Sequence, residues 1–102
     1  MSTLVVLFNL KQGADRAAYE QWALSTDLPV VRALPSVAGR FEVLRTAGLL
    51  GGGPAPYQYV EIIRFESLGQ FGEDIAGEAV QRVAAEFRAF ADQPLFMLAD
   101  AL

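Results

Sequence analysis

The sequence predicts an α+β domain in which strands and helices follow in the order βαββαβ. Short apolar runs typical of strands lie near both ends of the chain, and two segments of alternating polarity lie in the middle. Two segments with helical periodicity separate these strands. A chain of 102 residues has enough apolar surface for one core, so we expect residues 1–102 to form a single domain.

The first strand and the first helix are predicted from residues 3–34. Residues 3–9 (TLVVLFN) are typical of a strand buried on both faces. Asp15 can cap a helix whose apolar positions recur every three or four residues. We expect this helix to break before Pro29, because a proline disfavours the helical conformation in the residue before it. The pair Thr26-Asp27 could then cap a short turn over residues 29–34.

Two more strands and a long loop are predicted in the middle of the chain. Residues 37–46 and 57–65 alternate in polarity, which favours two strands of a hairpin. Residues 48–56 (GLLGGGPAP) lack periodicity and form the loop between them. No helix follows the Gly51–Gly53 run, so a phosphate-binding loop is not expected. The loop is either a passive connection or a flap over a pocket.

The last helix and strand are predicted from residues 67–99. Ser67 and Gln70 fit a capping box at the start of a helix, and Gly77 favours a break within it. Residues 92–94 (DQP) are expected to end the helix, and residues 95–99 (LFMLA) are typical of a last buried strand.

This element order predicts a ferredoxin-like fold. Right-handed crossovers place the first and third strands side by side in a four-stranded antiparallel sheet, with both helices on one face. The first and last strands are apolar on both sides, so the other face of the sheet also needs cover. A homodimer that packs two sheets face to face, a dimeric α+β barrel, is the simplest cover.

The composition excludes several classes of function. The chain has no cysteine and no histidine, so we expect no disulfide, no imidazole or thiolate catalysis, no metal site and no cofactor. Its net charge is −4 and its eight basic residues are scattered, which argues against nucleic acid as a partner. No apolar run approaches the roughly 20 residues of a membrane span, and no secretory signal is visible. We therefore expect a cytoplasmic protein without a membrane partner.

Asp27 is the first candidate for a catalytic residue. It lies where the first helix is expected to break, and there its carboxylate could transfer a proton at the mouth of a pocket. A plain helix cap is the alternative. Glu61 and Tyr59 share one face of the predicted third strand, and they could add a second carboxyl and a hydroxyl.

Arg45 and Asn9 are candidates for binding a substrate. Arg45 and Glu61 each share a strand face with apolar neighbours, so each charge needs a partner. They could form a structural ion pair with each other or orient the substrate together. Asn9, at the end of the first strand, could donate an amide hydrogen bond to a ligand or simply form a turn.

Tyr19 and Trp22 project from the buried face of the first helix. Aromatic side chains there could form the walls of a pocket for a flat ligand, with Trp22 the better candidate. Ordinary core packing is the alternative for both residues.

Almost the whole chain resembles one group of small bacterial proteins. The resemblance is carried by the two distinctive segments TDLPVVRALPSV and GLLGGG and by the segments LVVLFNLKQG, PYQYVEI and VAAEFRAFADQPLFML. It is similar to the REDY-like family of dimeric α+β barrel proteins, which are encoded in gene clusters for prodiginine, bisindole and related pigments. The resemblance implies a barrel dimer and a role in secondary metabolism. Some members of the wider superfamily depend on a histidine, which this chain lacks.

Together these observations favour a protein that binds a small aromatic heterocyclic molecule. One hypothesis is a cofactor-independent cyclase, condensation enzyme or lyase that acts on a flat pyrrole- or indole-derived intermediate. Asp27, Glu61 and Tyr59 would then be catalytic, and Trp22, Tyr19, Arg45 and Asn9 would bind the substrate. A carrier or protector of a reactive intermediate would use the same pocket without catalysis, and a purely structural partner would need only the dimer face.

Overall fold

The computed structural model describes residues 1–102 and has one four-stranded antiparallel sheet, with the strand order β2-β3-β1-β4. Strands β1 and β3 pair at its centre, so the predicted ferredoxin-like topology is confirmed. The elements along the chain are β1 (Ser2–Leu10), α1 (Arg16–Trp22), a π-helical turn η1 (Ala23–Asp27), α2 (Leu28–Arg32), β2 (Phe41–Arg45), β3 (Tyr59–Phe65), α3 (Leu68–Ile75), α4 (Glu78–Phe90) and β4 (Ala91–Asp100).

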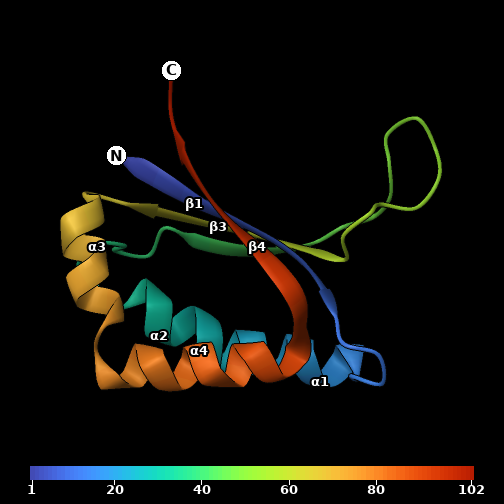
Figure 1. Ribbon diagram of the computed structural model, residues 1–102, viewed down its shortest axis with the longest axis horizontal. Coiled ribbons are helices and arrows are strands. Elements are labelled where there is room, and N and C mark those ends of the chain that lie inside the picture. The colour runs from blue at the N-terminus through green and yellow to red at the C-terminus, as the bar shows by residue number, and fades with distance from the viewer.

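The helices cover one face of the sheet and leave the other face bare (Figure 1). The core between the two layers has two parts. One is centred on Phe8, whose ring packs against those of Tyr19, Tyr59 and Phe87. The other joins α2, β2 and α3 and contains the stacked rings of Phe65 and Phe71, among others. None of the helices has the length and apolar character that a bilayer crossing requires.

The chain passes Pro29 without leaving the helical conformation. Helix α1 begins after the Asp15 cap, as predicted, and the chain then widens into η1, where the amide of Leu28 donates to the carbonyl of Ala23 five residues earlier. Pro29 has no amide hydrogen to contribute, and it sits in the first turn of α2, where that hydrogen is not needed. The predicted break before Pro29 is therefore wrong.

The same segment corrects the interpretation of Asp27 as a cap. Asp27 has helical backbone angles (φ −62°, ψ −57°), and its side chain makes no capping hydrogen bond. It is buried, with 4% of its surface exposed. The wide turn directs this carboxyl away from the helix end and toward the sheet.

Strand boundaries differ from the prediction at two places. Strand β2 starts at Phe41 rather than at residue 37, because Ala38 and Gly39 have positive φ angles and form a turn. Strand β4 starts at Ala91 and runs through Pro94, so residues 92–94 belong to the strand and not to the predicted end of the helix. A proline is tolerated there because β4 is an edge strand that pairs only with β1.

The bare face of the sheet carries two rows of apolar side chains. Strand registers place Met97, Val5 and Ile62 side by side in one row, and Leu95, Leu7, Val60 and Leu44 in the next. Within one chain β4 is exposed rather than buried, and the exposed fraction reaches 43% at Met97 and 45% at Leu95. The sequence predicts that β4 is buried, but within a single chain this strand is exposed.

Candidate active site

A cavity of about 430 Å³ lies between the sheet and the helices. Most of the side chains that line it are apolar, and they come from β1, η1, α2, β3, α3, α4 and β4. Only four lining residues are polar or charged: Asp27, Glu61, Gln81 and Arg88. The remaining lining residues are Leu4, Val31, Ile63, Phe71, Ile75, Val80, Val83, Ala84, Phe87, Pro94 and Phe96.

Burial divides the cavity into a floor and a rim. Asp27, Glu61 and Ile63 are buried and form part of the floor, with exposed fractions of 4%, 5% and 7%. Gln81 and Arg88 on α4 and Phe96 on β4 are exposed and form part of the rim. The two carboxyl groups are therefore buried at the floor of the cavity, whereas the arginine is exposed at its rim.

Asp27 and Glu61 are neighbouring carboxyl groups at the floor, each of which affects the pKa of the other. Burial is the main cause that raises the pKa of Asp27 to about 6, and the hydrogen bond from Glu61 opposes this rise. Burial also raises the pKa of Glu61 well above its usual range, and the negative charge of Asp27 and their hydrogen bond raise it further. Burial and the mutual repulsion of two negative charges therefore disfavour full ionisation of this pair of carboxyl groups.

Tyr19 lies behind this pair. The Tyr19 hydroxyl and Oε2 of Glu61 are both buried from solvent. Neither atom has a hydrogen-bond partner within the usual distance and angle limits. The hydroxyl is still close enough to lower the pKa of Glu61 slightly. Burial, followed by the charges of Glu61 and Asp27, raises the pKa of Tyr19 itself, so this phenol stays neutral. The arrangement from core to cavity is a phenol followed by two carboxyl groups.

Local structure explains why both carboxyl groups face the cavity. Alternation along β3 places Glu61 on the helix-covered side of the sheet with Tyr59 and Ile63. The π turn η1 adds one residue to the helix just before Asp27, which rotates the carboxyl of Asp27 toward the strand. An acid–base site is the chemistry that such a pair can perform, because one carboxyl can donate a proton while the other accepts one.

Tyr59 does not line the cavity. It is 1% exposed, its ring stacks on Phe8 in the core, and its hydroxyl donates to Oε2 of Glu20 over 2.6 Å. Burial is the main cause that raises the pKa of Tyr59 to about 12, and the hydrogen bond to Glu20 adds to the rise. The hydroxyl of Tyr59 therefore bonds to Glu20, Tyr59 is not among the residues that line the cavity, and its catalytic role stays a prediction.

Arg45 pairs with Glu20 rather than with Glu61. Its guanidinium donates two hydrogen bonds to the Glu20 carboxylate, at 2.8 Å to Oε2 and 2.5 Å to Oε1. These bonds, with the Tyr59 hydroxyl, lower the pKa of Glu20 to about 2. In the sheet, Arg45 lies opposite Tyr59, whereas Glu61 lies opposite Val43. The two-residue offset separates the two charges, so the predicted Arg45–Glu61 pair is wrong.

Trp22 and Asn9 also have structural contacts outside the cavity. The indole Nε1 of Trp22 donates to Oε1 of Glu86 on α4 over 2.8 Å, and its ring packs against Phe90. Asn9 holds the start of the β3 segment, because its amide donates to the carbonyl of Pro56 and its Oδ1 accepts from the amide of Gln58. Neither residue is among those that line the cavity.

The loop between β2 and β3 projects beyond the end of the sheet (Figure 1). None of its residues, including Gly51–Gly53, lines the cavity. The backbone of Leu49 hydrogen-bonds to that of Gly53 and Gly52, so the loop tip has a defined turn. Within one chain the loop therefore acts as a connection and not as a flap over this cavity.

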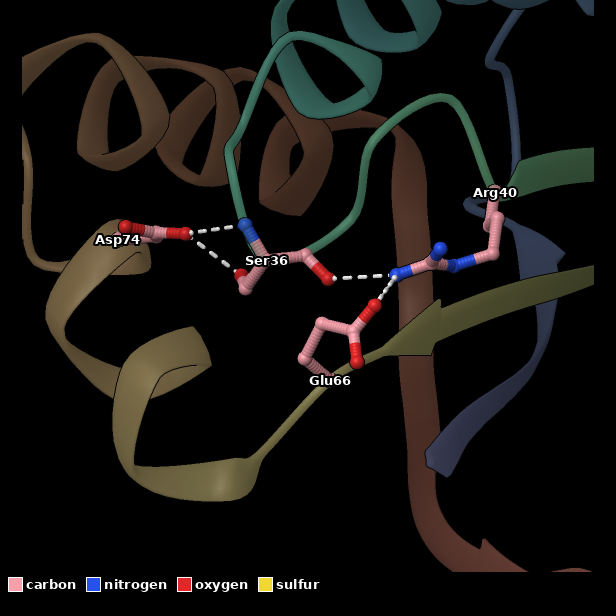
Figure 2. Close-up of polar contacts among 4 residues, drawn as sticks. All are labelled: Ser36, Arg40, Glu66 and Asp74. Atoms are coloured by element: carbon pink, nitrogen blue, oxygen red, sulfur yellow. Dashed lines mark hydrogen bonds and ion pairs between the residues drawn. The ribbon is translucent and has the colours of Figure 1, made fainter.

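Polar contacts hold helix α3, one wall of the cavity, in place (Figure 2). The carboxylate of Asp74 accepts from the amide of Ser36 at 2.9 Å and from its hydroxyl at 2.5 Å. Arg40 donates to the carbonyl of Ser36 and forms an ion pair with Glu66, just before α3. These contacts fix both ends of α3 and so position Phe71 and Ile75 against the cavity.

Sequence reasoning missed the rim of the cavity. Gln81, Ala84 and Arg88 follow each other at helical spacing on α4, and this spacing is the signal that could have indicated a shared face. Phe96 lies opposite Val6 across the β1–β4 pairing, so its direction depends on a register that the sequence alone does not state.

Comparison with known protein families shows which family the chain belongs to. Residues 2–102 match the family described as REDY-like protein HapK. The chain belongs to this family. The resemblance inferred from the sequence segments is therefore confirmed.

Individual relatives of this REDY-like chain agree with that result. An uncharacterized 11.0 kDa protein from the thcB-thcC intergenic region of Rhodococcus erythropolis is 31% identical over 98 residues, which cover 96% of this chain and 91% of that protein. The crystal structure of HapK from Hahella chejuensis is 28% identical, has a TM-score of 0.79 and covers 100% of this chain and 93% of its own. SnoaB, a cofactor-independent oxygenase from Streptomyces nogalater, is 20% identical with a TM-score of 0.78, over 99% of this chain and 92% of its own.

The structural matches confirm the α+β, ferredoxin-like fold class. One protein of similar fold, from Thermobifida fusca, is described as a dimeric ferredoxin-like protein, and it is 14% identical with a TM-score of 0.75. At 20% identity, SnoaB is similar in fold alone.

Proposed function

We propose that this REDY-like protein binds a flat, apolar small molecule in the cavity and that the Asp27–Glu61 pair transfers a proton to or from it. The observation that carries the proposal is a pair of neighbouring, buried carboxyl groups at the floor of a mostly apolar cavity. Such surroundings bring the pKa of Asp27 to about 6, close to the value at which a general base works best near neutral pH. Asp27 is the proposed base, and the neighbouring carboxyl of Glu61 is its partner in the site.

The reaction class that fits is a cyclisation, condensation or elimination that needs only proton transfer. The chain has no histidine or cysteine, and Asp27 and Glu61 are the only buried titratable residues that line the cavity. Members of the family are encoded in gene clusters for pigments built from pyrrole or indole units. We therefore propose a pyrrole- or indole-derived intermediate as the substrate. A cofactor-independent enzyme is known for the same fold in SnoaB, which supports a site that works without a bound cofactor.

The proposed active unit is a homodimer formed through the bare face of the sheet. The rows that contain Ile62 and Leu7 present a continuous apolar surface, and an exposed surface of this kind usually marks an interface. The dimeric protein of similar fold from Thermobifida fusca supports the same arrangement. The cavity lies on the opposite side of the sheet, so dimer formation leaves it within each chain.

The proton-transfer role can be tested without knowing the natural substrate. The probe 5-nitrobenzisoxazole is a flat, apolar heterocycle that loses its ring proton to a base, while its N–O bond breaks to give a coloured nitrile phenolate. We expect the protein to accelerate this elimination over free acetate at equal concentration, with a rate that rises as Asp27 ionises around pH 6. The rate is followed by the absorbance of the phenolate.

Three variants assign the base. Asp27→Asn should lower the rate about 100-fold, because a general base is lost while the shape is kept. Glu61→Gln retains a donor to Asp27 and should keep most of the rate. Glu73→Gln, which removes an exposed carboxyl of α3, is the matched control and should have no effect. If the wild type binds the probe without acceleration, the protein is a carrier rather than a catalyst. If Asp27→Asn keeps the accelerated rate, Asp27 is not the base and its proposed role is overturned.

A further inference from the structure

Arg88 is the only cationic side chain that lines the cavity. It lies at the exposed rim, in the last turn of α4. The two ion pairs of the chain involve Arg40 and Arg45, so Arg88 has no carboxylate partner. An unpaired arginine at the rim of an apolar cavity is a binding group for an anion or a strong hydrogen-bond acceptor.

The helix end alone does not explain the position of Arg88. A cation in the last turn of a helix interacts favourably with the free carbonyl groups there. Arg82 lies on the same helix and is also exposed, but it does not line the cavity. The direction of Arg88 toward the cavity is therefore a separate feature, shared with Gln81 and Ala84 on the same helix face.

The two ends of the cavity differ in charge. The floor carries the Asp27–Glu61 pair, which holds a negative charge once Asp27 is ionised. An anionic group of a ligand would be repelled at the floor and attracted at the rim. The buried rings of Phe71 and Phe87 and the exposed ring of Phe96 at the rim also line the cavity, and these rings suit an apolar body.

We propose that the ligand of this cavity carries an anionic group, a carboxylate or a group of similar charge, which Arg88 binds at the rim. The apolar body of the ligand lies against the phenylalanine rings, and its reacting end faces Asp27. This inference rests on the proposed function for the cavity itself and adds the charge and the orientation of the substrate. It also makes Arg88 the residue that distinguishes an acidic ligand from a neutral one.

A pair of fluorescent dyes tests this inference directly. 8-Anilinonaphthalene-1-sulfonate and N-phenyl-1-naphthylamine share the same aromatic body, but only the first has an anionic group. Dissociation constants for both dyes are measured by fluorescence titration with the wild type and with Arg88→Gln. We expect Arg88→Gln to weaken binding of the sulfonate about tenfold, and to change binding of the neutral dye by less than about twofold. Added salt should weaken binding of the sulfonate alone.

Two further variants control for charge and location. Arg82→Gln removes the same charge from the same helix outside the cavity, so both dissociation constants should stay unchanged. Ala84→Trp fills the cavity and should abolish binding of both dyes, with folding checked by far-UV circular dichroism. If neither dye binds, or if both still bind to Ala84→Trp, the cavity does not bind ligands and the proposed function fails as well. If both dyes bind in the cavity but Arg88→Gln and wild type bind the sulfonate equally, only the role of Arg88 is overturned.

Discussion

The buried carboxyl group of Asp27 on the π turn η1 neighbours that of Glu61 on the central strand β3, and both line the same cavity. Both groups are at least nine-tenths buried, yet together they carry a charge near neutral pH. Burial of such a charge costs stability, which a protein tolerates where the pair has another use. The consequences of this relationship can be measured by its effect on stability as well as on activity.

Stability is expected to fall as the pH rises through the range in which Asp27 ionises. The pKa of Asp27 is about 6 in the folded chain and 3.8 for an ordinary aspartate, so the folded state binds more protons between these values. The free energy of unfolding therefore decreases from about pH 4 to about pH 6 because of this residue. Asp27→Asn should remove this decrease and raise stability at pH 7 by about 1–3 kcal/mol. Urea unfolding of both proteins at several pH values gives the difference.

Glu73→Gln again serves as the control, because Glu73 is exposed. Other carboxylates shape the pH profile of the wild type, so the informative quantity is the wild type minus the variant. Parallel profiles for wild type and Asp27→Asn would contradict the burial of an ionising pair. If Asp27→Ala lowers the free energy of unfolding by about 1 kcal/mol and Asp27→Asn does not, Asp27 acts as a helix cap instead.

Tyr59→Phe is expected to lower stability by about 1 kcal/mol at neutral pH, because the Glu20 carboxylate loses a hydrogen-bond donor. The same loss should raise the pKa of Glu20 from about 2 toward its usual value. A lowered pKa stabilises the fold above the usual pKa of glutamate, and this stabilisation is lost as the pH falls toward 2. The penalty should therefore shrink in acid. Tyr57→Phe, whose hydroxyl has no such partner, is the control, and an equal penalty there would contradict the assignment.

A lysine on the bare face of the sheet should prevent dimer formation. Ile62 lies between Val5 and Glu42 in its row, so Ile62→Lys places a charge within the proposed interface. Sedimentation equilibrium should give twice the mass of one chain for the wild type and the mass of one chain for this variant. Leu24→Lys alters a side chain that is 70% exposed on the helical layer and should leave the dimer intact. A wild type that sediments as one chain at micromolar concentration would exclude the dimer.

The fold could be predicted from the sequence because its signals are local. Alternation along residues 57–65 predicts β3 and places Tyr59 and Glu61 on one face, as the structure has them. The cap at Ser67 and the break at Gly77 are likewise present. The π turn has no comparable signal, because it exchanges one set of backbone hydrogen bonds for another without a characteristic residue.

The candidate site can be predicted only in part, because its contacts join distant segments. Asp27 and Glu61 are both candidates from the sequence, but their pairing depends on how η1 packs against β3. Arg45 shares a face with its expected partner, yet the strand register places it beside Tyr59, within reach of Glu20. Register and packing decide which charges meet, and residue types at single positions do not carry that information.

The π turn at Ala23–Asp27 makes the direction of the Asp27 carboxyl depend on the number of residues in the helix before it. Each residue added to a helix rotates the next position by about 100° around the helix axis. A helix of identical composition with one residue fewer before Asp27 would direct this side chain away from Glu61 and present a neighbouring residue to the cavity. In this fold, therefore, the insertion or deletion of one residue in the first helix is enough to bring a carboxyl group into the cavity or to remove it.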